Sequence, residues 1–182
     1  IALTPQALER FHRVFGKNVA VIHSGLSLGQ RLDEWKRIKN GDAKVVIGTR
    51  SAILAPVDNI GLVVIDEEQE HTYKSESTPR FFAHDVAKFR CLNHNALLVL
   101  CSATPSVESY YFAKSGRYHL FELKNRYSDA TLPDVYIVDI KSDYNIREGK
   151  IFSDALLDEI RYNLDNKQQT ILLLNRRGHN TS

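Results

Sequence analysis

The sequence contains no methionine and only two cysteines, Cys91 and Cys101, among its 182 residues. Two cysteines without zinc-ligand spacing make neither a disulfide framework nor a zinc site, so a reducing, cytoplasmic setting is expected. No apolar run approaches the roughly 18 residues of a membrane span, and no charged-then-apolar leader opens the chain. These absences exclude a disulfide-rich secreted scaffold and argue against a membrane partner. Because position 1 is not methionine, we expect the chain to be an internal piece of a longer protein.

A large charge of one sign is missing as well. The chain has 24 Lys and Arg against 22 Asp and Glu, a formal net charge of +2, which is too small to indicate nucleic acid by itself. The distribution is uneven, however, because residues 1–50 hold nine basic and four acidic side chains, a local charge of +5. This excess fits either a solvated helix surface or a surface that faces phosphates.

What the sequence does contain is a series of short hydrophobic runs separated by helical patterns. Its length and its 43% of hydrophobic residues suit one globular domain, or one domain and a fraction of another. The nearly continuous apolar character of the runs predicts strands of a parallel sheet that is covered on both faces. These strands are expected at residues 19–23, 44–48, 62–66, 96–101, 135–139 and 170–174.

Helix starts are predicted where a capping residue precedes a proline, an acid or a Ser-x-x-Gln box. They lie at Thr4-Pro5, Ser27 to Gln30, Thr104-Pro105 and Ser153-Asp154. Gly16 is expected to end the first of these helices. Strands that alternate with helices predict an α/β, doubly wound fold. A polar stretch at 127–133 indicates a boundary, so we expect one domain over residues 1–130 and the start of another over 131–182.

The strongest local motif is an apolar strand that runs directly into three carboxylates, Asp66, Glu67 and Glu68. In open α/β sheets, ligands bind beyond the carboxyl ends of the strands. One carboxylate at such a place can hold hydrated Mg²⁺, and the next can orient the water that attacks a phosphate. The same pattern also fits a strand that ends in a solvated acidic turn.

A second motif places small hydroxyl residues, Ser102 and Thr104, just after the strand at 96–101. Their hydrogen bonds can connect a nucleotide site to a second ligand. An ordinary helix cap would give the same residues in the same place.

Two further motifs carry donors suited to phosphate. Thr49 and Arg50 follow Gly48 at the end of a predicted strand, where glycine permits close approach and the other two supply donors. Thr4 and Gln6 lie at a predicted helix N-terminus, which is a natural phosphate site. Either motif alone is more often structural.

Residues 71–85 interleave aromatic rings with basic side chains, among them Tyr73, Lys74, Arg80 and Phe81. Stacking rings together with cations suit single-stranded nucleic acid. A loop folded over the sheet edge with its rings buried is an equally good interpretation of the pattern.

The order of these motifs matters, because parallel strands would bring all of them to one edge of the sheet. The stretches that carry the pattern are IALTPQ (1–6), HSGL (23–26), RLDEW (31–35), VIGTRSAI (46–53), VIDEE (64–68), YK (73–74), SATP (102–105) and LLNRRG (173–178). With them, essentially the whole chain resembles superfamily 2 helicases, and within these the bacterial replication restart helicases. SATP is common to many helicases, whereas the combination of GTRSA, DEE…YK and LNRRG is specific.

The resemblance implies a RecA-like parallel sheet, that is, a P-loop NTPase helicase lobe, incomplete at both ends. It implies a DNA-dependent ATPase that moves 3′ to 5′, uses ATP and Mg²⁺, acts on forked and single-stranded DNA, and works with primosome and single-strand-binding proteins. Asp66 would hold Mg²⁺, Glu67 would activate water, and Ser102 and Thr104 would couple hydrolysis to movement. The implied DNA-binding residues are Thr4, Gln6, Thr49, Arg50, Tyr73, Lys74, Arg80 and Phe81, with Arg176 and Arg177 at the start of the second lobe.

The chain departs from the family at two positions. Gln69 stands where the family usually has His, and it can form hydrogen bonds but cannot carry a proton. His84 stands where the family usually has Arg, so one phosphate or carboxylate contact is expected to be weaker or pH-dependent.

Some of the family's motifs are missing from these 182 residues. They contain no Gly-x-x-x-x-Gly-Lys-Ser/Thr phosphate loop, no structural zinc cysteines and no second-lobe arginine finger. The zinc site would therefore lie in the parent protein, outside this chain. The alternatives are another superfamily 2 translocase, or a lobe that binds DNA without hydrolysing ATP.

Overall fold

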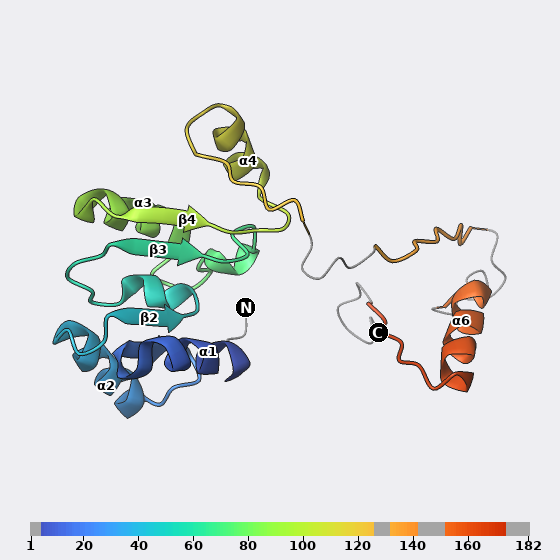
Figure 1. The fold of residues 1–182 in the computed structure, drawn as a ribbon, viewed down its shortest axis with the longest axis horizontal. Helices are drawn as coiled ribbons and strands as arrows, with labels where there is room; N and C mark the ends of the chain where they lie inside the picture. The colour runs from blue at the N-terminus through green and yellow to red at the C-terminus, as the bar shows by residue number, and fades with distance from the viewer. Residues whose placement is uncertain (1–4, 126–131, 142–151, 174–182) are drawn as a thin grey trace. The chain divides into compact units, whose positions relative to one another are not determined.

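The computed structural model describes residues 5–125, 132–141 and 152–173, and the chain divides into two compact units. The first unit is Ile1–Glu122 and the second is Leu123–Ser182 (Figure 1). In the first unit, helices alternate with short strands: α1 (Pro5–Phe15), β1 (Val19–Ile22), α2 (Leu28–Lys39), β2 (Val45–Gly48), the 3-10 helix η2 (Arg50–Leu54), β3 (Leu62–Ile65), the 3-10 helix η3 (His71–Tyr73), α3 (Ala83–His94), β4 (Leu97–Leu100) and α4 (Val107–Lys114). The second unit contains α6 (Asp154–Asp165).

The four strands form two parallel pairs. In the first pair β1 lies beside β2, with Val19 opposite Val45, and in the second β3 lies beside β4, with Leu62 opposite Leu97. Figure 1 shows β2, β3 and β4 running in the same direction. The α/β class, the parallel pairing within each pair and the first four predicted strands are therefore confirmed, whereas the described residues form two separate sheets and not the single sheet that was predicted.

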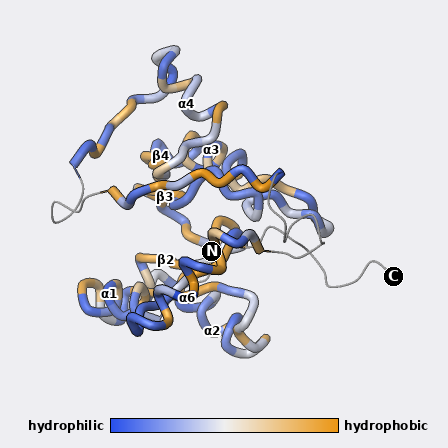
Figure 2. The backbone as a smooth tube through the Cα atoms, turned by 90° about the vertical axis from the view of Figure 1, so that its right-hand side faces the viewer, coloured by the Kyte–Doolittle hydropathy of each residue, from blue (hydrophilic) through white to orange (hydrophobic). Residues whose placement is uncertain are grey.

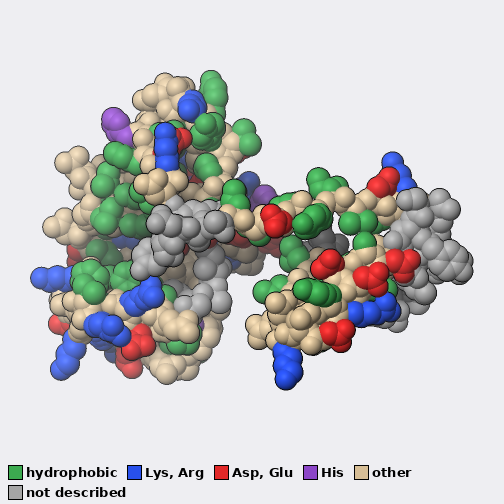
Figure 3. Space-filling model, turned by 45° about the vertical axis from the view of Figure 1, so that its right-hand side comes forward, with side chains coloured by type: hydrophobic (Ala, Val, Ile, Leu, Met, Phe, Trp, Pro, Cys, Tyr) green, Lys and Arg blue, Asp and Glu red, His purple; other side chains and the backbone are tan. Residues whose placement is uncertain are grey.

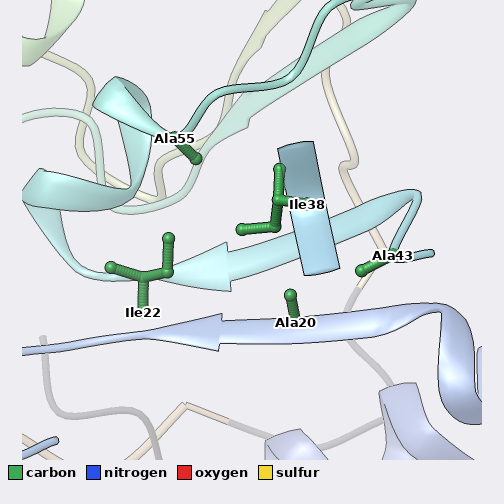
Figure 4. Packing of buried hydrophobic residues seen from close by; sticks show 5 residues of the cluster. All are labelled: Ala20, Ile22, Ile38, Ala43 and Ala55. Carbon is green, nitrogen blue, oxygen red and sulfur yellow. The ribbon is translucent and has the colours of Figure 1, made fainter. Parts of the chain in front are cut away.

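The core of the first unit lies between α2 and the β1–β2 pair. Ile38 of α2 packs against Ala20 and Ile22 of β1, together with Ala43 and Ala55 (Figure 4). Val19 points to the other face of β1 and is only 1% exposed, so both faces of this strand are covered. Figure 2 shows hydrophobic and hydrophilic residues interspersed along both the helices and the strands.

Local capping chemistry sets several helix ends. Ser27 and Gln30 form a capping box, because Gln30 N donates to Ser27 Oγ at 3.3 Å and Ser27 N donates to Gln30 Oε1 at 3.0 Å. Ser153 caps α6. Gly16 follows α1 with φ +55°, the left-handed conformation that ends a helix at glycine. These three predictions are confirmed.

The helix start predicted at Thr104-Pro105 is wrong. Ser106 caps α4, which begins at Val107, and Ser109 N donates to Ser106 Oγ at 3.3 Å. The backbone N–H of Thr104 donates instead to Ser102 Oγ at 2.9 Å, so it belongs to a turn that precedes the helix.

The strands predicted at 135–139 and 170–174 are also not found in the described residues, which reach only to residue 173 in the second case. Val135 and Ile171 are exposed, and no strand among the described residues pairs with either segment. A strand without a neighbour leaves its backbone groups unbonded, so an apolar run alone does not form one.

Helix α3 was not predicted from the sequence. Its buried side is a stripe of small residues, Ala83, Ala87 and Cys91, spaced four apart. Because large apolar residues do not mark this face, the helical period is weak in the sequence. α3 contacts both β3 and β4 and so supports the strands that end in the polar motifs.

The surface of the first unit reflects the uneven charge. In Figure 3, Lys and Arg side chains gather over the lower part of this unit, where α1 and α2 lie. Among the residues that the structure describes, no helix is both long and apolar enough to span a membrane.

Candidate functional site

The candidate site lies where β3 and β4 end. The segments that follow β3 and β4 stay side by side beyond the paired strands. Cys101 N donates to the Ile65 carbonyl at 2.8 Å, and Glu68 N donates to the Cys101 carbonyl at 3.0 Å. The acidic motif and the Ser-Ala-Thr motif therefore occupy neighbouring strand ends, as the parallel arrangement predicted.

The acidic turn, which consists of Asp66, Glu67 and Glu68 after β3, points its carboxylates in different directions. Glu67 has φ +48°, in the left-handed region that non-glycine residues rarely adopt, and its N–H donates to Asp66 Oδ1 at 3.1 Å. As a result Asp66 is exposed, whereas Glu68 is 4% exposed. Unusual backbone conformations of this kind cluster at functional sites.

Gln69 connects the two strand ends through its side chain. Its Nε2 donates to Glu67 Oε2 at 2.8 Å, and its Oε1 accepts from Ser102 Oγ at 2.6 Å. Ser102 Oγ in turn accepts from Thr104 N at 2.9 Å. The Glu67 carboxylate is thus held in position by a chain of hydrogen bonds that begins at the other strand.

Glu68 has a different environment, because it is buried beside the start of α4. Its carboxylate accepts from Ser106 N at 2.6 Å, from Ser106 Oγ at 3.1 Å and from Ser109 Oγ at 3.0 Å. A carboxylate at a helix N-terminus is favoured by the helix dipole. Glu68 therefore anchors α4 to the end of β3 and is not available to a nucleotide.

His84, at the start of α3, is buried against the other side of Glu68. Its Nε2 lies 3.5 Å from Glu68 Oε2, and its ring stacks on Phe82 at 4.3 Å between ring centroids. Burial lowers the pKa of His84, while the neighbouring Glu68 opposes that shift. Among the described residues, neither ring nitrogen has a hydrogen bond of ordinary geometry.

The aromatic segment, residues 71–85, folds back on itself over the acidic turn. An antiparallel bridge joins Lys74 to Phe82, and Ser75 N donates to the Phe81 carbonyl at 2.8 Å. Tyr73 donates its hydroxyl to the Asp66 carbonyl at 2.7 Å. Burial raises the pKa of Tyr73, and the charges of Asp66, Glu70 and Glu67 raise it further. The segment is thus bonded directly to the acidic turn.

The first unit also holds Thr49 and Arg50 close to this segment. Gly48 is required at the end of β2, since a Cβ there would collide with the Ile22 carbonyl and the Ala52 side chain. Thr49 N donates to the Ile22 carbonyl at 3.3 Å. Arg50 Nη1 donates to the Thr72 and Lys74 carbonyls at 2.8 and 2.6 Å, so the turn after β2 contacts the loop after β3.

For the remaining predicted DNA-binding residues, the structure shows no direct contact with the acidic turn among the described residues. Gln6 lies exposed in the first turn of α1, and Arg80 is exposed at the tip of the aromatic segment. Phe81 lies under the Arg50 guanidinium, 5.8 Å from its ring centroid, and Lys74 Nζ lies 5.4 Å from the Phe82 ring centroid. Thr4, Arg176 and Arg177 lie outside the described residues.

The carboxylates of the acidic turn suit Mg²⁺ better than a metal that needs a full set of protein ligands. Among the described residues there is no group of three or more His, Cys, Asp or Glu side chains that could hold a metal ion. Mg²⁺ is commonly held by one or two carboxylates, with water and phosphate oxygens completing its coordination. Exposed Asp66 fits that requirement.

Sequence reasoning missed the residues that surround Glu68. It treated Glu68 only as part of an acidic run and did not consider Ser106 or Ser109. These partners lie 38 and 41 residues away along the chain. The one available signal was the run of three carboxylates itself, because three adjacent side chains cannot all face the same ligand.

Comparison with known proteins agrees with this geometry. Residues 1–111 match the family described as DEAD/DEAH box helicase. The whole chain is 42% identical to the replication restart protein PriA of Bacillus subtilis and 43% identical to that of Treponema pallidum, of which it covers 22% and 27%. It is 41% identical to the PriA protein of Synechocystis, covering 22% of it. The chain thus spans about a quarter of the length of these relatives.

Proposed function

The chain belongs to the DEAD/DEAH box helicase family, and from that premise we propose that its parent protein is an ATP-dependent 3′-to-5′ DNA helicase of replication restart. Residues 1–130 would form most of the first motor lobe, a RecA-like sheet without its phosphate-loop strand. Residues 131–182 would begin the second lobe. The similarity to proteins named replication restart protein PriA supports this assignment along the whole chain.

The observation that carries the proposal is the connection between the two strand ends. Asp66 is exposed, Glu67 lies next to it, and Gln69 ties the Glu67 carboxylate to Ser102. Asp66 would hold Mg²⁺, which supplies positive charge to neutralise the phosphate oxygens of ATP. Glu67 would orient the attacking water and accept its proton, with its carboxylate kept in place by Gln69.

Ser102 and Thr104 are proposed to transmit changes at the acidic turn to the rest of the motor. Ser102 contacts both Gln69 and the backbone of Thr104. A change in the position of Glu67 would therefore reach the turn that precedes α4. This is a physical connection of the kind that coupling between sites requires.

The DNA-facing surface is proposed to include Thr4, Gln6, Thr49, Arg50, Tyr73, Lys74, Arg80 and Phe81, with Arg176 and Arg177 in the second lobe. Exposed cations beside aromatic rings in the segment 71–85 support a single-stranded substrate. Forked DNA, primosome proteins and single-strand-binding proteins are proposed as partners because the named relatives restart replication. A cytoplasmic location and a structural zinc site elsewhere in the parent protein complete the proposal.

The deciding experiment is ATP hydrolysis by the intact parent protein, with and without forked DNA, beside a Glu67→Gln variant. We expect DNA-stimulated turnover that falls by at least ~10²-fold in the variant, as for loss of a group that positions and deprotonates water. DNA binding by the variant should be retained, because Glu67 is not among the proposed DNA-binding residues. If neither protein hydrolyses ATP while both bind DNA, a DNA-binding lobe without ATPase activity becomes the better assignment.

A further inference from the structure

Arg50 comes from a rigid part of the first unit. It is the first residue of η2, directly after Gly48 and Thr49, whose backbone is bonded to β1. The other end of η2 is held by Arg90 of α3, whose guanidinium donates to the carbonyls of Ile53, Ala55 and Val57 at 2.6, 2.9 and 3.0 Å. The backbone from which Arg50 extends is therefore fixed at both ends.

The Arg50 side chain reaches both arms of the aromatic segment, that is, the residues on either side of the Lys74–Phe82 bridge. Its Nη1 donates to the Thr72 and Lys74 carbonyls, which lie on the first arm. The guanidinium lies over the ring of Phe81, on the second arm, at a distance typical of a cation–π contact. One side chain thus holds together two arms whose backbones are joined by the Lys74–Phe82 bridge and by the hydrogen bond from Ser75 N to the Phe81 carbonyl.

Tyr73 lies between the two carbonyls that Arg50 binds, and it is the residue that contacts the acidic turn. Its hydroxyl donates to the Asp66 carbonyl at 2.7 Å, and its ring meets that of His84 edge to face at 5.4 Å. Any movement of the Thr72 and Lys74 carbonyls therefore moves Tyr73, and with it the backbone that carries Asp66 and Glu67. Arg50 is thus connected to the acidic turn through the carbonyls of Thr72 and Lys74, to which it donates, and through the Tyr73 hydroxyl, which donates to the Asp66 carbonyl.

We propose that Arg50 is a positioning residue for hydrolysis: it clamps the aromatic segment so that Tyr73 fixes the Asp66–Glu67 turn. The clamp connects the β1–β2 pair, which carries Arg50, to the β3–β4 pair, which carries the acidic turn. Both hydrogens on Nη1 are used on carbonyls, so a role as a simple phosphate ligand does not explain this geometry. The inference rests on the proposed ATPase function and adds a coupling role to a residue expected only to lie along DNA.

Lysine cannot replace arginine in such a clamp, although it preserves the charge. A lysine ammonium is a point charge on a flexible stem, without the planar group that bonds two carbonyls while covering a ring. The Arg50→Lys variant therefore loses the clamp but keeps a positive charge that can attract phosphate. Arg161 of α6 supplies the control, because it is an exposed arginine outside the proposed site, and a lysine can keep its contact with Asp158.

The experiment compares the wild-type intact protein with Arg50→Lys and Arg161→Lys, using single-stranded and forked DNA. Amide hydrogen exchange is measured over residues 71–82, with α2 as an internal reference, and turnover is measured as a function of DNA concentration. For Arg50→Lys we expect exchange of the Lys74 and Ser75 amides to rise at least several-fold while α2 is unchanged. We also expect kcat at saturating DNA to fall about tenfold, with half-saturating DNA within about threefold of wild type. Arg161→Lys should change neither quantity.

Three results would overturn the clamp. The first is unchanged exchange of the segment in Arg50→Lys. The second is a rise in half-saturating DNA at unchanged kcat, which would make Arg50 a phosphate ligand only. The third is faster exchange in α2 as well, which would indicate general unfolding. A wild-type protein without DNA-stimulated turnover would refute the proposed function instead, and the exchange of residues 71–82 would still decide whether Arg50 clamps the segment.

Discussion

At the scale of single residues, the amide of Gln69 performs a task that few side chains can. It donates to Glu67 from one end and accepts from Ser102 at the other, and it is neutral. A carboxylate at this position would repel Glu67, and an aliphatic side chain would leave Glu67 free to rotate. The position therefore requires a neutral group that both donates and accepts, a requirement that histidine also meets.

Changing Gln69 tests that requirement. In the intact protein we expect Gln69→Ala to lower DNA-stimulated kcat about tenfold, which corresponds to roughly 1.4 kcal/mol of lost positioning. Gln69→Glu should lower it further, because a second charge would face Glu67. Gln69→His is the control and should retain most of the activity. Full activity in Gln69→Ala would show that the bridge to Ser102 does not orient Glu67.

His84 predicts a dependence of stability on pH. Burial lowers its pKa below the ordinary value of 6.5, despite the attraction of Glu68, and Lys88 acts in the same direction as burial. The folded protein therefore binds a proton at His84 less readily than the unfolded chain does. This contribution to stability is present above about pH 6.5 and is lost as the pH falls through the lower, folded-state pKa.

His84→Phe measures this contribution, because it keeps an aromatic ring against Phe82 and Tyr73 but removes the titration. We expect the wild-type melting temperature to fall more steeply than that of the variant between about pH 7 and pH 5. The measurement is thermal denaturation of the intact protein at several pH values. Parallel curves for the two proteins would show that His84 is not the group responsible.

At the scale of elements, helix starts that depend on neighbouring residues could be predicted from the sequence, whereas contacts between residues far apart in the chain could not. The capping box of α2 depends on Ser27 and Gln30 alone, so its start could be predicted. α3 could not be, because its buried stripe of small residues becomes apolar packing only once β3 and β4 lie beside it. The hydrogen bond between Gln69 and Ser102 spans 33 residues, and only the paired strands bring its two ends together.

Glycine substitutions separate packing from helix propensity. Gly48→Ala should destabilise the protein by about 2 kcal/mol, because the new Cβ would overlap the Ile22 carbonyl and the Ala52 side chain. Gly29→Ala, in α2, is the matched control: nothing lies near its Cβ, and alanine should stabilise the helix by about 0.5 kcal/mol. Thermal denaturation of the intact protein should show shifts of opposite sign. A neutral Gly48→Ala would mean that the turn after β2 is not tightly packed.

At the scale of the whole molecule, the residues that the structure describes leave an apolar surface uncovered. Leu62, Val64 and Leu97 lie on one face of the β3–β4 pair and are exposed, whereas α3 contacts this pair and buries its own small-residue stripe. Contiguous apolar surface of this kind usually marks a place where other protein packs. The remaining length of the relatives, about three quarters, leaves ample chain to provide that cover in the parent protein.

The acidic turn is therefore expected to need more than these residues. Asp66 and Glu67 are proposed to supply the metal-holding and water-orienting groups, but these 182 residues contain no phosphate loop to bind the β- and γ-phosphates of ATP. We predict that a protein consisting of residues 1–182 alone hydrolyses ATP no faster than its Glu67→Gln variant, with or without DNA. Phosphate release is measured for both, with the intact parent protein as the positive control. Clear turnover by residues 1–182 that disappears in Glu67→Gln would mean that the strand ends bind ATP phosphates without a phosphate loop.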